Sequence, residues 1–308
     1  MHRPATPSDL ALPRCNPLAD GLRTQPRPPG ARLGVLGGMG PLATVDFLAK
    51  LIAATPARFD EDHIPVLTWS VPQIPDRLAA IEGRGPSPLP MMVEALQALA
   101  GCGAVQAVIA CNTAHYWYDA LVEQGGLPIV HIADAASEAI SAAAGPGQAR
   151  ADGRRVALLA TRGTHVAGFY APRLATLGHR PLPPDERMQR ECIDPAIDAV
   201  KANRLQAAGM HLGEALGRLQ AMDVDIVLLG CTELPLAYAS FLAQAERAAL
   251  PVIDATQALA VACVRDWGYP LPGASTSLAT PHSSSTSPSP SPSPSPSPAT
   301  SLSIERTQ

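Results

Sequence analysis

Short apolar runs alternate with longer amphipathic stretches through the middle of the chain. The runs are rich in Val, Ile and Leu, and they predict strands at residues 32–38, 66–71, 104–110, 128–133, 154–160, 225–230 and 251–255. Continuous apolar runs are typical of strands buried on both faces, as in a parallel sheet covered by helices. Helices are predicted in the gaps, among them 41–54, 88–101, 134–144 and 204–221. The pattern therefore predicts an α/β fold, in which ligands bind beyond the carboxyl ends of the strands.

Two stretches of this pattern recur at nearly the same offset. RLGVLGGMG (32–40) is similar to RVALLATRG (155–163), 123 residues later, and a strand ending on cysteine recurs after 120 residues. Chance similarity between Val/Leu-rich strands is the alternative explanation. The repeat predicts two similar α/β subdomains with parallel-rich sheets, related by a pseudo-twofold, with the active site in the cleft between them. We expect residues 31–132, completed by 250–268, to form the first subdomain and residues 133–249 the second.

Both ends of the chain have a composition that does not favour folding. Residues 1–30 contain seven prolines, and residues 271–308 include the low-complexity tract SPSPSPSPSPSP. Such segments bury too little apolar surface to offset the entropy lost on ordering. We therefore expect a disordered N-terminal extension and a disordered Ser/Pro-rich tail.

Composition and charge narrow the partners that the chain can have. A net charge of −4 gives no reason to expect nucleic acid or an anionic membrane, and 4% aromatic residues argue against base stacking. The apolar runs are far shorter than the ~20 residues of a membrane-spanning helix, and the N-terminus does not have the pattern of a signal peptide. A cytoplasmic protein is expected.

Two of the six cysteines are the strongest candidates for chemistry. QAVIACNTAH (106–115) and DIVLLGCTEL (225–234) each end an apolar strand on a cysteine, Cys111 and Cys231, followed by polar residues. A small buried apolar role is the usual alternative for a cysteine. A turn from a strand into a helix, however, offers free N–H groups and a helix dipole, which lower the pKa of a thiol. Two such thiols facing one cavity can act as a paired acid and base. The sequence has no CxxC pair, so a zinc site is not predicted.

The motifs around these cysteines resemble those of the aspartate/glutamate racemase superfamily, most closely its aspartate racemase branch. The resemblance rests on Lys201 and on five segments, LGVLGGMGPLAT (33–44), PQIPDR (72–77), ACNTAHYWYD (110–119), TRGTHVAGFY (161–170) and LLGCTELP (228–235). Glu233 stands where the glutamate racemase branch usually has histidine, which favours the aspartate branch.

The resemblance implies a racemase that works without a cofactor or a metal. One cysteine thiolate would remove the Cα proton of an amino acid while the other cysteine returns a proton to the opposite face, with Cys111 and Cys231 exchanging these roles. Arg77 and Lys201 would hold an acidic substrate such as aspartate. The other residues expected to line the substrate site are Met39, Asn112, Thr113, Thr161, Thr232 and Glu233. A homodimer is also implied by the family.

Several features admit a second interpretation. GMGPLA (38–43) fits a dinucleotide-binding pattern, but the acidic residue expected at the end of the second strand is missing. His115 lies four residues after Cys111, and a packing role is favoured over a metal site. Glu233 either assists Cys231 or caps the following helix. The alternatives to aspartate racemisation are racemisation of glutamate or a wider range of amino acids, decarboxylation or isomerisation of a small diacid, and binding of a small acid without catalysis.

Overall fold

The structure, a computed structural model, describes residues 30–143, 153–244 and 250–270. The predicted tail and all but the last residue of the predicted N-terminal extension lie outside the described residues. None of the helices in the described ranges combines the length and the apolar character that crossing a bilayer requires.

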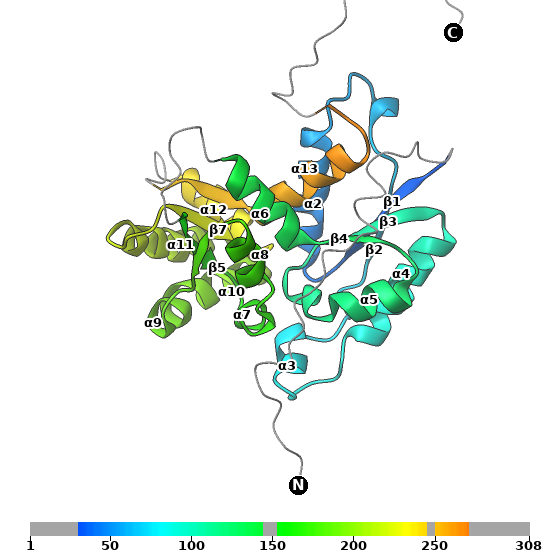
Figure 1. Cartoon of the computed structure of the whole chain (residues 1–308). Coiled ribbons are helices and arrows are strands. Elements are labelled where there is room, and N and C mark those ends of the chain that lie inside the picture. Colours follow the sequence, from blue (N-terminus) through cyan, green and yellow to red (C-terminus); the bar gives the residue numbers. More distant parts are fainter. Residues whose placement is uncertain (1–29, 144–152, 245–249, 271–308) are drawn as a thin grey trace, which may run out of the picture. The chain divides into compact units, whose positions relative to one another are not determined.

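Two four-stranded parallel sheets form the framework of the described residues (Figure 1). The strand order is β2-β1-β3-β4 in the first sheet and β6-β5-β7-β8 in the second, and every neighbouring pair is parallel. The strands are β1 (Arg32–Gly37), β2 (Val66–Ser70), β3 (Ala104–Ile109), β4 (Ile129–Val130), β5 (Arg155–Leu159), β6 (Arg180–Leu182), β7 (Ile226–Leu229) and β8 (Val252–Asp254). The same order in both sheets confirms the predicted repeat, with β7 standing in the second sheet where β3 stands in the first.

Helices connect the strands, as the parallel pairing requires. The first half contains α2 (Pro41–Ala54), η2 (Asp60–Asp62), α3 (Arg77–Ile81), α4 (Leu89–Gly101), η3 (Thr113–Trp117), α5 (Tyr118–Gly125) and α6 (Ile132–Ala142). The second contains α7 (Arg162–Ala167), α8 (Tyr170–Thr176), α9 (Glu186–Met188), the π turn η4 (Gln189–Ile193), α10 (Asp194–Lys201), α11 (Leu205–Gln220), α12 (Leu234–Leu242) and α13 (Ala255–Asp266).

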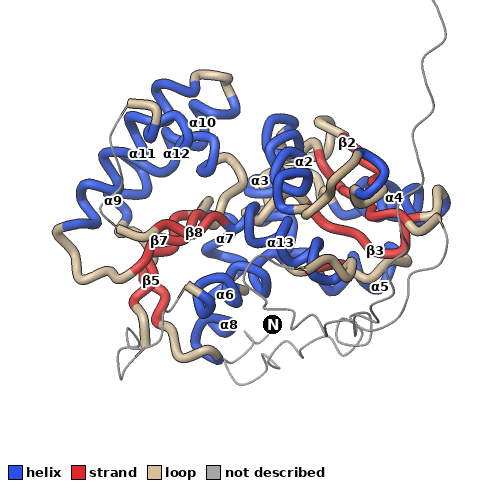
Figure 2. Tube along the Cα trace, turned by 90° about the horizontal axis from the view of Figure 1, so that it is seen from above, coloured by secondary structure: helices blue, strands red, loops and turns tan. Residues whose placement is uncertain are grey.

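The largest hydrophobic cluster lies between the two sheets. Alternate strand residues from both halves, such as Val35 and Val108 of the first and Val156 and Leu228 of the second, pack with α2, α6, α8 and α13. Figure 2 shows α13 between the two sheets. The strand residues of opposite parity face two outer clusters, one with α4 and α5 and one with α10, α11 and α12. Both faces of each sheet are therefore covered, which confirms the α/β fold predicted from the continuous apolar runs.

Helix α2 begins and ends at the predicted residues. Pro41 occupies the first turn, where its missing N–H has no partner to lose. Phe47 is fully buried, whereas Val45 and Ile52 are 62% and 59% exposed. The outer side of α2 is thus apolar and open to solvent.

Strands β6 and β8 depart from the predicted organisation. Strand β6 was not predicted, because Arg180–Leu182 is short and contains Pro181; it pairs only with β5, at the edge of the sheet, where proline is tolerated. Strand β8 extends the second sheet beside β7, although residues 250–268 were expected to complete the first half. Its hydrogen-bonding partner is the free edge of β7, whereas the following helix α13 packs against α2, and Asp254 at the end of β8 forms an ion pair with Lys50 of α2.

Candidate active site

The two candidate thiols leave their sheets at equivalent positions. Cys111 follows β3 and packs in the outer cluster of the first half with Ile109, and Cys231 follows β7 and packs in the outer cluster of the second half with Leu229. The cysteine side chains are 5% and 3% exposed. The strand repeat therefore gives each half one buried thiol at the carboxyl end of its sheet, as predicted.

Burial dominates the acidity of both thiols. It raises the pKa of Cys111, and it raises the pKa of Cys231 well above the usual range. A backbone hydrogen bond from the following turn lowers the pKa in each case, as the sequence predicts, but it does not outweigh the loss of solvent. The expected lowering of the thiol pKa is thus overturned, because the predicted effect of the turn is smaller than that of desolvation.

Arg77 supplies a cation that pairs with no carboxylate of the described residues. Its Nη1 donates to the carbonyl oxygens of Ile74 and Pro75, both at 3.1 Å, and its Nη2 donates to the carbonyl of Met39 at 3.4 Å. Its buried Nε has no partner among the described residues. The guanidinium lowers the pKa of Cys111, second only to the opposite effect of burial. Arg77 is therefore held next to this thiol by backbone oxygens, which leave its charge available to an anion.

Lys201 brings a second cation from the other half. It ends α10, and burial works to lower its pKa, but Glu233, Cys231, Asp198 and Asp76 together raise it. Asp76 belongs to the first half, at the start of α3. Lys201 also lowers the pKa of both Cys111 and Cys231. Groups of both halves thus act on the same pair of thiols.

Glu233 is hydrogen-bonded to Cys231. The thiol of Cys231 donates to Glu233 Oε2 at 2.9 Å, and Thr232 Oγ1 donates to the same oxygen at 3.3 Å. Glu233 Oε1 is 3.6 Å from the position that a Cβ on Gly40 would take. The carboxylate, 5% exposed, therefore reaches from the second half to the glycine turn of the first.

Asn112, next to Cys111, has one satisfied and one unsatisfied side-chain atom. Its Oδ1 accepts a hydrogen bond of 2.5 Å from the hydroxyl of Tyr170, while its buried Nδ2 has no partner among the described residues. This fixes the orientation of the amide and leaves a free N–H₂ donor beside the thiol. Tyr170, in α8, was not predicted as a site residue; it ends the segment TRGTHVAGFY, but no sequence pattern indicates its partner.

Comparison with known proteins shows the family to which this chain belongs. Residues 36–263 match the model of the family described as Asp/Glu/hydantoin racemase. The chain belongs to the Asp/Glu/hydantoin racemase family. It is an isomerase of the racemase type, as the resemblance of its motifs predicts.

Two solved structures are similar to this racemase in fold, and a third protein is similar to it in sequence. An aspartate racemase of Picrophilus torridus is 28% identical in sequence, with a TM-score of 0.66 over 78% of this chain and 96% of that one. A glutamate racemase of Campylobacter jejuni, at 21% identity, has a TM-score of 0.55 over 79% and 88%. The broad specificity amino-acid racemase RacX of Bacillus subtilis is 22% identical over 75% of this chain and 96% of its own.

The two halves of the racemase also meet through threonine hydroxyls. Thr113 Oγ1 lies 2.8 Å from Thr161 Oγ1 and 3.2 Å from Thr164 Oγ1, and the last two are 3.0 Å apart. Gly163 allows this approach, since a Cβ there would lie 2.7 Å from Thr113 Cγ2. Thr113 and Thr161, predicted to line the substrate site, are thus engaged with each other, and Thr164 was not predicted.

The remaining residues that the sequence singles out in this racemase are buried and make contacts with neighbouring side chains or backbone groups. Met39 is buried in the hydrophobic cluster that contains Cys111. Its backbone carbonyl accepts the hydrogen bond from Arg77 Nη2. His115 donates from Nδ1 to the carbonyl of Cys111 at 2.9 Å and accepts at Nε2 from the N–H of Ile132 at 3.3 Å. Those two bonds give His115 the role in packing that the sequence favours. In the ranges that the structure describes, no group of three or more potential ligands is suited to a metal ion.

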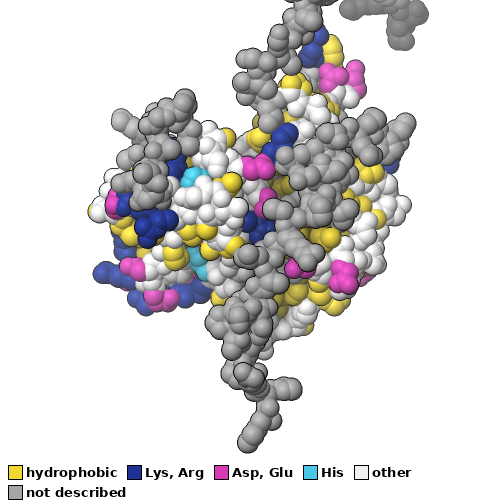
Figure 3. Space-filling view, viewed as in Figure 1, with side chains coloured by type: hydrophobic (Ala, Val, Ile, Leu, Met, Phe, Trp, Pro, Cys, Tyr) yellow, Lys and Arg dark blue, Asp and Glu magenta, His cyan; other side chains and the backbone are white. Residues whose placement is uncertain are grey.

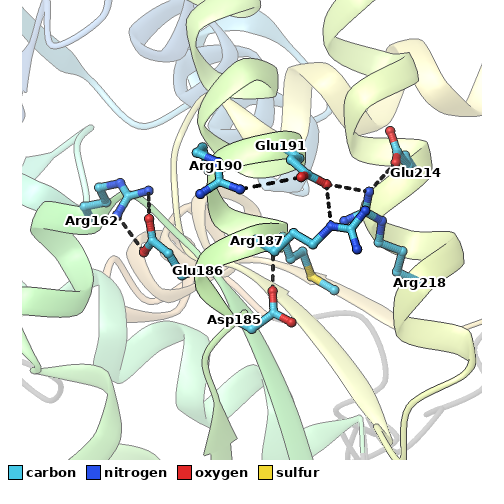
Figure 4. Close-up of polar contacts among 9 residues, drawn as sticks. Arg162, Asp185, Glu186, Arg187, Arg190, Glu191, Glu214 and Arg218 are labelled. Atoms are coloured by element: carbon cyan, nitrogen blue, oxygen red, sulfur yellow. Dashed lines mark hydrogen bonds and ion pairs between the residues drawn. The ribbon is translucent and has the colours of Figure 1, made fainter.

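An ion-pair network joins α10, the helix that ends at Lys201, to the neighbouring helices. Figure 3 shows basic and acidic side chains intermixed over the part of the molecule where α9 lies. Arg162, the first residue of α7, forms a bidentate pair with Glu186 of α9, with both distances 2.9 Å (Figure 4). Its Nε also donates to Asp194 of α10 at 2.9 Å. Arg162 therefore fixes α7, which begins next to the threonine contact, against the helix that ends at Lys201.

Proposed function

We propose that this racemase interconverts L- and D-aspartate without a cofactor, by proton transfer at Cα between Cys111 and Cys231. The observation that carries the proposal is the equivalent placement of two buried thiols after β3 and β7, with Lys201 and Glu233 acting on both. The aspartate racemase of Picrophilus torridus, at 28% identity over most of both chains, supports aspartate as the substrate.

The proposed reaction needs one base and one acid on opposite faces of the substrate. The thiolate of one cysteine removes the Cα proton, and the thiol of the other returns a proton to the opposite face. Negative charge develops on the substrate carboxylate during this transfer. The free Nδ2 donor of Asn112 is suited to receive that charge, while the backbone N–H groups that bond to each sulfur stabilise its thiolate form.

Two cations match the charge of a dicarboxylic amino acid. Arg77 has no carboxylate partner among the described residues, so a substrate carboxylate would be its counter-ion. Lys201 ends α10 and lies within electrostatic range of both thiols. A guanidinium binds a carboxylate through two parallel hydrogen bonds, whereas an ammonium adds a mobile point charge.

A racemase of glutamate or of a wider range of amino acids is the second candidate. It is favoured by the similarity to the broad specificity racemase RacX over 75% of this chain. Turnover measured with a panel of L-amino acids separates the two: the proposal expects aspartate to have the highest kcat/KM, and the alternative expects comparable values for neutral amino acids.

The proposal includes a cytoplasmic homodimer. A reducing compartment keeps catalytic thiols free, and all five cysteines of the described residues are free. The exposed apolar side of α2, with Leu42, Val45 and Ile52, provides a surface for a second copy. Sedimentation of the native protein tests the dimer, and a monomer at all concentrations would contradict it.

The experiment follows the Cα proton of each enantiomer. The native protein, dialysed against EDTA and supplied with no pyridoxal phosphate or nucleotide, is incubated with L- or D-aspartate in D₂O and monitored by proton NMR. We expect deuterium at Cα and formation of the other enantiomer. Cys111→Ser and Cys231→Ser should lower racemisation by a factor on the order of 10² to 10⁴, because a serine hydroxyl is too weak an acid to supply the base.

The single variants also test the geometry. Each surviving thiol faces one side of Cα, so each variant should exchange the proton of only one enantiomer, and the two variants should favour opposite enantiomers. Cys102→Ser, at the exposed end of α4, is the matched control and should leave racemisation unchanged. Full racemisation by either active-site variant, or activity that returns only with added metal, would refute the proposal.

A further inference from the structure

Gly163 is a buried helix residue at a place where the structure has no room for a side chain. It is the second residue of α7, and its φ angle is not in the left-handed region that favours glycine. Glycine also weakens a helix relative to alanine, so neither the backbone nor the helix requires a glycine here. The reason is space: an added Cβ would lie 2.7 Å from Thr113 Cγ2 and 3.3 Å from Ile81 Cδ1.

The atoms around this position belong to the first half of the chain. Thr113 begins η3, and Ile81 ends α3, the helix in which Arg77 is the first residue. Leu78 of α3 also reaches the contact, with its Cδ1 3.6 Å from the added Cβ. Helix α3 has five residues, none of them buried, and it packs against α7 and η3. Gly163 therefore lies where the helix that carries Arg77 rests on the second half.

The hydrogen bonds of Arg77 do not fix its distance from the second half. Its guanidinium donates to the carbonyl oxygens of Ile74, Pro75 and Met39, which all belong to the first half. These bonds orient the guanidinium relative to its own half. The second half carries Lys201, the other cation of the site. The spacing of the two cations therefore depends on how closely α3 approaches α7.

We propose that Gly163 is a positioning residue for Arg77: the close approach that it allows seats α3 against α7 and sets where the guanidinium meets a carboxylate of the substrate. The inference rests on the proposed role of Arg77 in binding an acidic amino acid. A misplacement of about 1 Å, caused far from the chemistry, can lower a rate about 100-fold. A methyl group at Gly163 therefore affects substrate binding although it does not touch the substrate.

Steady-state kinetics of Gly163→Ala tests this role. We expect KM for aspartate to rise about tenfold and kcat to change by less than about threefold, because Arg77 binds the substrate and does not transfer the proton. Gly217→Ala is the matched control, since Gly217 lies in α11 and an added Cβ there meets no atom within 4 Å. It should leave both constants unchanged. A fall in kcat with an unchanged KM would overturn the inference, because the methyl group would then act on the proton transfer.

Removing the methyl group of Thr113 tests the contact itself. Thr113→Ser deletes Cγ2, the atom nearest to the added Cβ, and keeps the hydroxyl that contacts Thr161 and Thr164. Measured against Thr113→Ser alone, Gly163→Ala should raise KM only about twofold. An equal rise with and without Cγ2 would overturn the inference. Leu78→Ala removes a side chain of α3 from the contact and should also raise KM severalfold, and it carries the test if Gly163→Ala does not fold.

The Nε–H signal of Arg77 reports its surroundings in the resting protein, because this group is buried and has no hydrogen-bond partner among the described residues. The signal is identified in a proton–nitrogen correlation spectrum by its loss in Arg77→Gln. We expect Gly163→Ala to shift it, and Thr113→Ser added to that variant to return it towards its original position. Gly217→Ala should leave it in place. An unshifted signal in Gly163→Ala would overturn the inference.

The binding of two small acids tests the role without turnover. Succinate has a carboxylate at each end, whereas butanoate has the same carbon chain with one carboxylate. Calorimetric titration should show that the native protein prefers succinate and that Gly163→Ala lowers this preference about tenfold. A preference that is missing in the native protein, or unchanged in Gly163→Ala, would overturn the inference even if racemisation is confirmed. If the preference falls as expected and the protein does not racemise aspartate, the proposed function fails and the positioning role of Gly163 stands.

Discussion

Tyr170 is the residue whose role depends most on a single contact. Its hydroxyl fixes the amide of Asn112 through a 2.5 Å bond, so Tyr170→Phe frees the amide to rotate. We expect kcat/KM for aspartate to fall about two- to tenfold, corresponding to the ~0.5–1.5 kcal/mol of one hydrogen bond. Steady-state kinetics checks this, with Tyr118→Phe as the control, because that hydroxyl bonds to the carbonyl of Ile129 and not to Asn112. Equal losses in the two variants would show that Tyr170 acts only through packing.

Individual residues also mark the limit of what the sequence predicts. The positions of Cys111 and Cys231 follow from the apolar pattern, because a strand buried on both faces has to end where polar residues begin. The partner of Asn112 lies 58 residues away, and hydrophobic periodicity contains no information about such a pair. The direction of the Glu233 side chain is equally hidden, since capping a helix and bonding to a thiol require the same residue at the same position.

At the scale of elements, Arg162 joins three helices of the second half. It pairs with Glu186 of α9 and Asp194 of α10 from the first position of α7. Arg162→Ala should lower the melting temperature by only a few degrees, since the pairs are partly exposed. The KM for aspartate should rise severalfold, because α10 ends at Lys201. Arg187→Ala, which removes a pair with Glu191 that does not reach α7, is the matched control. A normal KM with a large loss of stability would contradict this role.

Elements are predicted from sequence where one physical preference dominates. Helix α2 follows the prediction at both ends, because Pro41 suits a first turn and apolar positions recur with helical spacing. The predicted strand 128–133 shortens to β4, because α6 begins at Ile132, with the side chain of His131 as its cap. The sheet to which β8 belongs is set by the free edge of β7, a tertiary feature that local pattern does not contain.

For the whole molecule, buried histidines predict a loss of stability in acid. Burial lowers the pKa of His115 to about 4, and it lowers the pKa of His131, His165 and His179 as well. The unfolded chain binds these protons near pH 6.5 and the folded protein does not. The free energy of unfolding is therefore highest above about pH 6.5 and falls as the pH drops through the folded pKa.

The decrease in the free energy of unfolding at acid pH has an expected size that urea unfolding can test. For His115, the difference between 6.5 and about 4 corresponds to roughly 3 kcal/mol. Urea unfolding between pH 7.5 and pH 4 should show the decline, and His115→Gln should make the pH dependence less steep. His211→Gln, in α11, serves as the control outside this buried cluster. An unfolding free energy that stays constant over this pH range would contradict the prediction.

The repeated strand order has a consequence for kinetics. Two halves built alike place similar groups around a substrate, but the groups are not identical, since Thr113 and Glu233 stand at the two corresponding positions. Free L- and D-aspartate have equal energies, so in the proposed reaction kcat/KM must be the same in both directions. The unequal halves can therefore make kcat and KM differ between the enantiomers only by the same factor. At low concentration the two mirror images are converted equally fast, and at saturation one of them is converted faster.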